Sequence, residues 1–191
     1  MSMPVLEDSS IPHGQIKPNS SIGKWLTLAA TVSDTIVETG TFCGLGSTYC
    51  LAMGLKRPEQ QMWTFETEPK HHKIAEGLYS HYPNLHTING KLQDHTNLLP
   101  DLIDLCLLDG GQLPQDTKAE VEAVIDKTKV IALDDSDRLK NIDHVPKFKE
   151  RGWITMIEVK FPFPDRRFGF YAARNPAYSD RDWETDRKSV V

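Results

Sequence analysis

The sequence predicts an α/β protein in which five parallel strands are followed by an antiparallel hairpin, with helices on both faces of the sheet. Short apolar runs alternate with longer amphipathic runs along the chain, a pattern typical of parallel strands joined by helical crossovers. The last two apolar runs, residues 154–159 and 168–172, are separated only by residues 160–167. Because this connection is too short for a crossover helix, we expect the two runs to pair as a hairpin.

The other elements are predicted from the same pattern, with short apolar runs for strands and longer amphipathic runs for helices. The expected parallel strands are residues 35–38, 62–66, 86–88, 103–108 and 130–133. The expected helices are residues 21–31, 47–55, 70–81, 96–99, 115–127 and 142–151.

The bulk composition bounds the class of protein. A chain of 191 residues, 39% of them hydrophobic, suits one domain with a substantial core. The formal charge of −5 argues against a dedicated nucleic-acid binder, and no apolar run approaches the roughly 20 residues that cross a membrane. Three cysteines on apolar segments favour buried free thiols in a reducing cytoplasm.

We assign residues 20–175 to the domain, residues 1–19 to an irregular N-terminal segment and residues 176–191 to a disordered tail. The first segment is polar and contains prolines, without the charged start and apolar stretch of a signal peptide. The last six residues, Asp-Arg-Lys-Ser-Val-Val, match the translation of a common sequencing adapter. We hypothesise that they are an artefact, the alternative being an ordinary disordered tail.

A glycine-rich turn follows the first strand. Residues 38–47 read ETGTFCGLGS, and the next helix is expected to begin at Ser47. Glycines let the backbone approach a ligand closely, and a helix start offers free N–H groups to a carboxylate or phosphate. The alternative is a tight turn without a ligand. A nicotinamide-binding fingerprint fits less well, because Tyr49 stands where its third glycine would be.

Two further polar segments follow the next strands. Glu66 ends the second strand, where a carboxylate can accept both hydroxyls of a ribose; the alternative is a solvated acid. The segment Asn89-Gly90-Lys91-Leu92-Gln93-Asp94 follows the third strand and can supply polar contacts to the edge of a base.

Together these segments resemble the class I S-adenosylmethionine (SAM)-dependent methyltransferases, in particular the catechol O-methyltransferase-like and macrolide/sugar O-methyltransferase-like branches. In the former branch the first motif reads Glu-Leu-Gly-Ala-Tyr-Cys-Gly-Tyr-Ser, one residue shorter than residues 38–47. The motif after the third strand reads Gly-Ala-Ser-Gln-Asp, which matches residues 90–94, Gly-Lys-Leu-Gln-Asp. The resemblance covers roughly residues 36–173.

The resemblance implies a Rossmann-like seven-stranded sheet with a reversed last strand and SAM across the carboxyl ends of the strands. It implies that Glu38, Gly40 and Ser47 hold the methionine part, Glu66 the ribose, and Gln93 the adenine. The cofactor pocket expected on this basis also includes Thr41, Phe42, Gly44 and Asp109.

Three acids end the fourth and fifth strands: Asp109, Asp134 and Asp135. Adjacent strands lie about 4.8 Å apart, so we expect these side chains to converge. They would repel one another without a proton or cation, and Mg²⁺ prefers such oxygen ligands. The related branches place a metal on the matching acids. The alternative is that Asp109 only lines the SAM pocket and that the pair caps the next helix.

The general base of the related branches is missing. The lysine of the catechol-type branch would stand at Gln112, and the aspartate of the sugar-methylating branch would stand at Gly111. Neither glutamine nor glycine can take a proton. Lys140, His144 and Asp137 are the candidate substitutes, unless a metal alone acidifies the acceptor.

The favoured hypothesis is Mg²⁺-assisted O-methylation of a small molecule such as a sugar or phenol. We expect no nucleic-acid or membrane partner, and a homo-oligomer remains open. The alternatives are a metal-independent methyltransferase, a non-catalytic SAM-binding module and a nicotinamide-dependent oxidoreductase.

Overall fold

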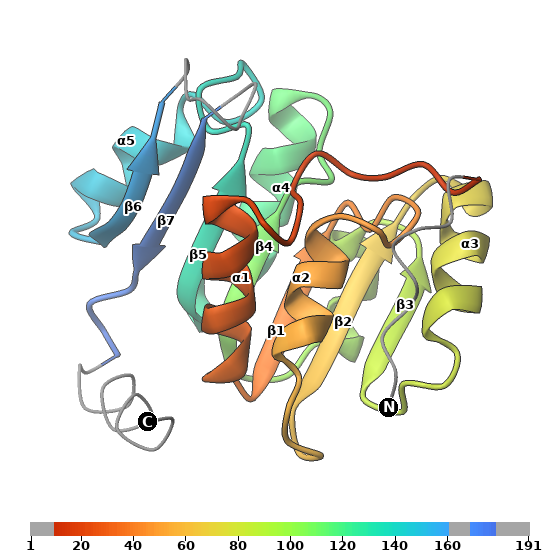
Figure 1. Cartoon of the computed structure of the whole chain (residues 1–191). Helices are drawn as coiled ribbons and strands as arrows, with labels where there is room; N and C mark the ends of the chain where they lie inside the picture. The colour runs from red at the N-terminus through yellow and green to blue at the C-terminus, as the bar shows by residue number, and fades with distance from the viewer. Residues whose placement is uncertain (1–9, 161–168, 179–191) are drawn as a thin grey trace.

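The computed structural model describes residues 10–160 and 169–178, which form a seven-stranded sheet with helices on both faces (Figure 1). The strand order is β3-β2-β1-β4-β5-β7-β6. The first five strands are parallel, and β7 runs antiparallel to both of its neighbours, β5 and β6. The predicted fold class is therefore confirmed. The strands are β1 (Thr35–Thr39), β2 (Gln61–Glu66), β3 (Leu85–Asn89), β4 (Ile103–Leu108), β5 (Thr128–Asp134), β6 (Ile154–Val159) and β7 (Phe170–Arg174).

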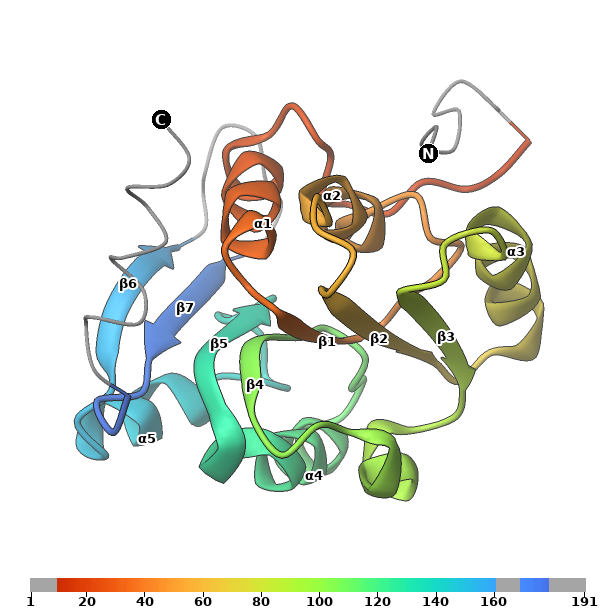
Figure 2. The ribbon, with the colours of Figure 1, turned by 90° about the horizontal axis from the view of Figure 1, so that it is seen from below.

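The helices form two layers. Figure 2 shows α1, α2 and α3 on one face of the sheet and α4 and α5 on the other. The α-helices are α1 (Ser21–Thr31), α2 (Ser47–Gly54), α3 (Pro69–Tyr79), α4 (Pro114–Val124) and α5 (His144–Glu150), and the 3-10 helices are η1 (Leu92–Leu98) and η2 (Ile125–Lys127). The expected helix over 115–127 is thus divided into α4 and η2, and the short one over 96–99 overlaps the end of η1.

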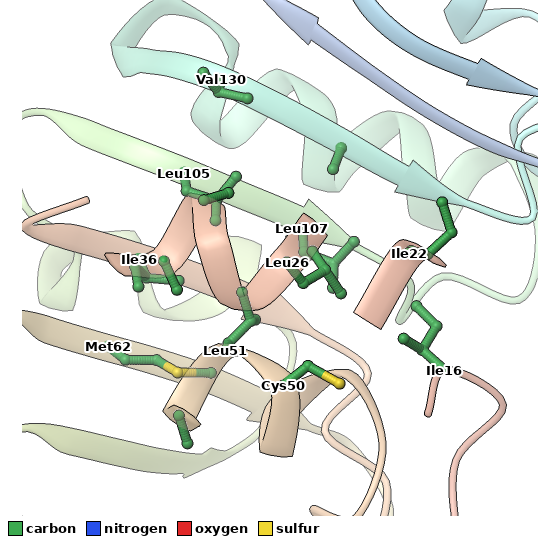
Figure 3. Packing of buried hydrophobic residues seen from close by; sticks show 14 of the residues in the cluster. Ile16, Ile22, Leu26, Ile36, Cys50, Leu51, Met62, Leu105, Leu107 and Val130 are labelled. Carbon is green, nitrogen blue, oxygen red and sulfur yellow. The ribbon is translucent and has the colours of Figure 1, made fainter. Parts of the chain in front are cut away.

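Apolar residues fill both spaces between sheet and helices. On one face, Leu26 of α1 and Leu51 of α2 pack over side chains of the central strands (Figure 3). The opposite face buries the alternate residues of the same strands under α4 and α5, including Val37, Cys106 and Ile131. This two-sided burial explains why the central strands read as continuous apolar runs. The three cysteines are buried free thiols, as predicted.

Strand β7 and the N-terminal segment lie near the two ends of the described chain. Strand β7 begins at Phe170, opposite Asp134 of β5, rather than at residue 168, which lies outside the described residues. Residues 10–20 run along the carboxyl edge of the sheet before α1 begins (Figure 1), and the Ser20 hydroxyl caps α1 by accepting from the Gly23 N–H at 3.0 Å. The proposed artefact at 186–191 lies outside the described residues.

The order of the strands locates a crevice. The chain moves from β1 outward to β2 and β3 and then returns to place β4 on the other side of β1. The loops leaving β1 and β4 therefore diverge at the carboxyl edge, which is where open α/β sheets bind ligands. Within the described residues, no helix combines the length and the hydropathy that a membrane span needs.

Candidate active site

A cleft of about 650 Å³ opens at the carboxyl ends of the parallel strands. The loops that follow β1, β2, β3, β4 and β5 all line it, together with a stretch of the N-terminal segment. Most of the cofactor residues expected from the sequence lie on its wall: Gly40, Thr41, Phe42, Ser47, Glu66, Gln93 and Asp109. Glu38 and Gly44 do not line the cleft.

The glycine turn brings the loops after β1 and β4 into contact. Gly40 has a φ of +86°, and its N–H donates to the Phe65 carbonyl at 2.9 Å. A Cβ atom on Gly40 would lie 2.9 Å from the carbonyl carbon of Asp109. Glycine is therefore required here both by the backbone conformation and by the close approach of the neighbouring loop.

Glu66 organises the turn from the adjacent strand. Its carboxylate accepts from the Phe42 N–H at 2.7 Å and from the Glu68 N–H at 2.8 Å. Phe42 has a φ of +52°, uncommon for a residue other than glycine, and the Glu66 bond secures it. A carboxylate has about four acceptor positions, so Glu66 keeps capacity for a ligand in the cleft.

Glu38 supports the turn from beneath. Its side chain is fully buried, and one oxygen accepts from the hydroxyls of Thr48 and Thr64, both at 2.7 Å. The other oxygen, Oε1, has no hydrogen-bond partner among the described residues. Burial raises the pKa of Glu38 from 4.5 to about 7. Gly44 has a similar supporting place, because its carbonyl accepts from the buried Tyr79 hydroxyl at 2.7 Å.

The raised pKa of Glu38 predicts a pH-dependent stability. Between pH 4.5 and about 7, the unfolded chain releases a proton that the folded protein retains. The free energy of unfolding should therefore fall as the pH rises through this window. We expect Glu38→Gln to lose the share of this dependence that Glu38 contributes, because its amide does not ionise. Urea unfolding at pH 5 and pH 8 measures the effect, and equal pH slopes for the two proteins would contradict it.

Sequence reasoning missed Glu120 in the middle of α4. This side chain is buried, lines the cleft, and has one oxygen without a partner among the described residues. Its pKa is raised to about 7, mainly by burial, although hydrogen bonds from the Gly111 N–H and the Thr39 hydroxyl oppose the shift. The available signal was an acid on the apolar face of α4, between the buried residues Thr117 and Val124.

The N-terminal segment was also missed as part of the site. Residues 13–16 line the cleft. The Gly14 N–H donates to the Leu45 carbonyl at 3.3 Å, and a Cβ on Gly14 would lie 2.9 Å from Cα of Gly46. The segment therefore lies directly against the glycine turn. A glycine within an otherwise irregular polar stretch was the only sequence signal for this contact.

Two of the three strand-end acids meet at a lysine. The Lys140 ammonium lies 3.2 Å from Asp109 Oδ1, 3.4 Å from Asp135 Oδ2 and 3.3 Å from the Asp109 carbonyl oxygen. Only 10% of the Lys140 side chain is exposed. Burial by itself would lower the pKa of Lys140, but the neighbouring carboxylates outweigh it and raise the pKa. A lysine therefore supplies the positive charge that the converging acids require.

The predicted metal centre is not formed. Over residues 10–160 and 169–178, no group of three or more histidine, cysteine or acidic side chains is arranged to hold a metal ion. Asp134 is buried and does not line the cleft, and its carbonyl accepts from the Asn141 amide at 2.6 Å. It nevertheless neighbours Asp109, whose pKa is raised by burial and then by the charge of Asp134. The physical reason is that Lys140 already fills the space between Asp109 and Asp135, so these residues do not fit a Mg²⁺ ion as they stand.

Of the three candidate bases, Lys140 alone lines the cleft. His144 is buried beside a separate groove between α4 and α5. Asp137 accepts from the Gly169 N–H at 2.8 Å and so connects the loop after β5 to the start of β7. Both residues followed β5 closely in sequence, but the path of the loop carries them away from the cleft.

No protein-family model matches the sequence, and a comparison with curated proteins finds no match. Solved structures, in contrast, match over nearly the whole chain. An O-methyltransferase from Bacillus cereus in complex with S-adenosylhomocysteine (SAH) is 20% identical, with a TM-score of 0.67 over 89% of this chain and 87% of that one. The chain has the fold of the class I SAM-dependent methyltransferases.

This methyltransferase fold is shared with other proteins, among which an O-methyltransferase and an rRNA methylase differ in the reaction that their names give. The SAH-bound methyltransferase PaMTH1 from Podospora anserina is 17% identical, with a TM-score of 0.60 over 80% of this chain and 77% of that one. An rRNA methylase from Streptococcus thermophilus is 16% identical, with a TM-score of 0.63 over 82% of this chain and 97% of that one. The acceptor must therefore be inferred from the cleft itself.

Proposed function

We propose that this protein is a SAM-dependent methyltransferase that transfers a methyl group to a hydroxyl of a small molecule. One observation carries the proposal: a single cleft is lined both by the glycine turn, Glu66 and Gln93 and by Asp109, Asp135 and Lys140. The first group suits the cofactor, and the second suits a polar acceptor.

The cofactor half of the cleft has a group for each part of SAM. Helix α2 begins without a side-chain cap among the described residues, and its start at Gly46 and Ser47 lines the cleft, where its first N–H groups can bind the methionine carboxylate. Glu66 retains acceptor positions for the ribose hydroxyls. Gln93 Oε1 is buried without a partner among the described residues and belongs to the cleft wall, where it can accept from the adenine amino group.

The charge of the cleft favours a small acceptor over RNA. A nucleic-acid site usually neutralises phosphates with lysine and arginine. Here acids outnumber bases on the wall: Glu66, Glu68, Asp109, Asp116, Glu120 and Asp135 against Lys91, Arg138 and Lys140. Together with the net charge of −5, this lining would repel a phosphate backbone.

Methyl transfer is an in-line displacement. A bond forms between the acceptor oxygen and the methyl carbon while the bond from that carbon to sulfur breaks, SAH departs and the hydroxyl proton is released. The protein mainly contributes by holding the two reactants in line. We favour a reaction without a metal ion, because Lys140 compensates the charge of the acids beside the acceptor space.

Calorimetry and an acceptor panel test the proposal. We expect SAM and SAH to bind, and NAD, the control, not to bind. We also expect labelled SAM to methylate a phenol or sugar in the presence of EDTA. Binding of NAD instead of SAM would indicate an oxidoreductase. SAM binding without transfer would indicate a non-catalytic module, and methylation of total RNA alone would overturn the small-molecule acceptor.

A further inference from the structure

Asp135 has an unusual backbone for its position. It follows β5 directly, and its φ of +53° places it in the left-handed region. This conformation is unfavourable for most residues but is best tolerated by asparagine and aspartate. Backbone strain of this kind concentrates at functional sites. Here it accompanies a carboxylate that lies on the wall of the cleft.

The two oxygens of Asp135 have different surroundings. Oδ2 lies 3.4 Å from the Lys140 ammonium. Oδ1 is buried and has no hydrogen-bond partner among the described residues. Only 13% of the Asp135 side chain is exposed. A buried carboxylate oxygen without a donor is unfavourable, so a ligand that brings a donor into this part of the cleft would be favoured.

Lys140 contacts the two acids in different ways. Its ammonium donates hydrogen bonds to the Asp109 carbonyl and to Asp109 Oδ1, and it forms an ion pair with Asp135 Oδ2 at 3.4 Å. Lys140 thus holds the two acids in place, and Asp135 Oδ1 is the carboxylate oxygen that has no partner among the described residues.

From this geometry we propose that Asp135 Oδ1 accepts a hydrogen bond from the hydroxyl of the acceptor, while Lys140 takes the place of a divalent cation between Asp109 and Asp135. Lys140 is a positioning residue, and Asp135 contacts the substrate. The acceptor class is then a neutral molecule with an O–H donor, because a phosphate or carboxylate would present only negative oxygens to this carboxylate. The acceptor role rests on the proposed function; the place of Lys140 does not.

Manganese binding tests the place of Lys140 without any methyl transfer. We expect no saturable Mn²⁺ binding by the wild-type protein or by Lys140→Arg, measured by calorimetry and electron paramagnetic resonance. Lys140→Ala should expose the two carboxylates and gain an Mn²⁺ site that raises its melting temperature. A second substitution, Asp135→Asn, should remove the gained site. Lys140→Gln serves the same purpose if Lys140→Ala does not fold.

Either of two results would overturn this arrangement: saturable Mn²⁺ binding by the wild-type protein that depends on Asp135, or no Mn²⁺ binding by a folded Lys140→Ala or Lys140→Gln protein. These measurements stand even if the protein transfers no methyl group, so failure of the proposed function is recognised separately by the absence of SAM binding.

Asp135→Asn by itself tests the contact with the acceptor. Asparagine has the size of aspartate and tolerates the left-handed backbone. With its amide oxygen facing Lys140, its NH₂ group takes the place of Oδ1 and presents a donor instead of an acceptor. We expect kcat/KM for the acceptor to fall roughly 10- to 150-fold, the effect of losing a hydrogen bond to a charged group. The Kd for SAM should stay within about twofold of the wild-type value, since Asp135 is not among the residues that we propose hold the cofactor. Asp101→Asn, on an exposed turn, is the matched control, and an unchanged kcat/KM in Asp135→Asn would overturn the contact.

Discussion

Glu66→Ala is expected to weaken SAM binding roughly 10- to 150-fold, because a lost hydrogen bond to a charged group costs about 1.5–3 kcal/mol. The proposed ribose contact is one part of this effect. The other is that the substitution removes the acceptor of the Phe42 and Glu68 N–H groups, so the glycine turn loses the contact that holds it in its binding conformation.

The same substitution should also lower the stability of the protein. Glu66 is only 9% exposed, and leaving its two N–H partners without an acceptor is expected to reduce the free energy of unfolding by about 1–3 kcal/mol. Calorimetry with SAM and urea unfolding measure the two effects. Glu76→Ala on the exposed side of α3 is the control and should leave both quantities unchanged. Unchanged SAM affinity in Glu66→Ala would rule out the ribose assignment.

Gly40→Val is expected to abolish measurable SAM binding and to destabilise the fold. A side chain at φ +86° is strained, and its Cβ would lie 2.9 Å from the Asp109 carbonyl carbon and 3.0 Å from the Gly110 nitrogen. Both neighbours are backbone atoms, so the loops after β1 and β4 must separate. We expect a loss of about 1–3 kcal/mol in the free energy of unfolding.

Gly77→Ala provides the matched control for this prediction. Gly77 lies within α3, and a Cβ there would meet nothing within 4 Å. Alanine should therefore stabilise the protein by about 0.5–1 kcal/mol and leave SAM affinity unchanged. Thermal unfolding with and without SAM compares the two variants. A Gly40→Val protein that binds SAM normally would show that the turn has room to adjust.

The elements of the fold could be predicted because local periodicity encodes them. Helix α1 and strands β4 and β6 have the bounds that the sequence indicated. The short connection before β7 was enough to predict the reversed strand. Its insertion between β5 and β6 was not predicted and is a finding of the structure.

The positions of individual side chains were harder to predict. Glu38 lies next to the end of β1 and Glu66 ends β2, both beside the glycine turn, yet Glu38 is buried beneath the turn and Glu66 lines the cleft. Alternate residues of a strand face opposite sides of a sheet, but which strand-end side chain reaches the cleft depends on how the following loops pack. His144 and Asp137 lie outside the cleft for the same reason.

The sequence by itself determined the sheet, the glycine turn and the convergence of Asp109 with Asp135, because these follow from strand periodicity and from the alignment of parallel strand ends. Only the tertiary structure decided that Lys140 lies between the two acids and that residues 13–16 cover the glycine turn. Lys140 is 31 residues from Asp109, and residues 13–16 precede the first strand. Their contacts depend on the paths of irregular segments across the carboxyl edge, and irregular segments have no repeating pattern from which those paths could be predicted.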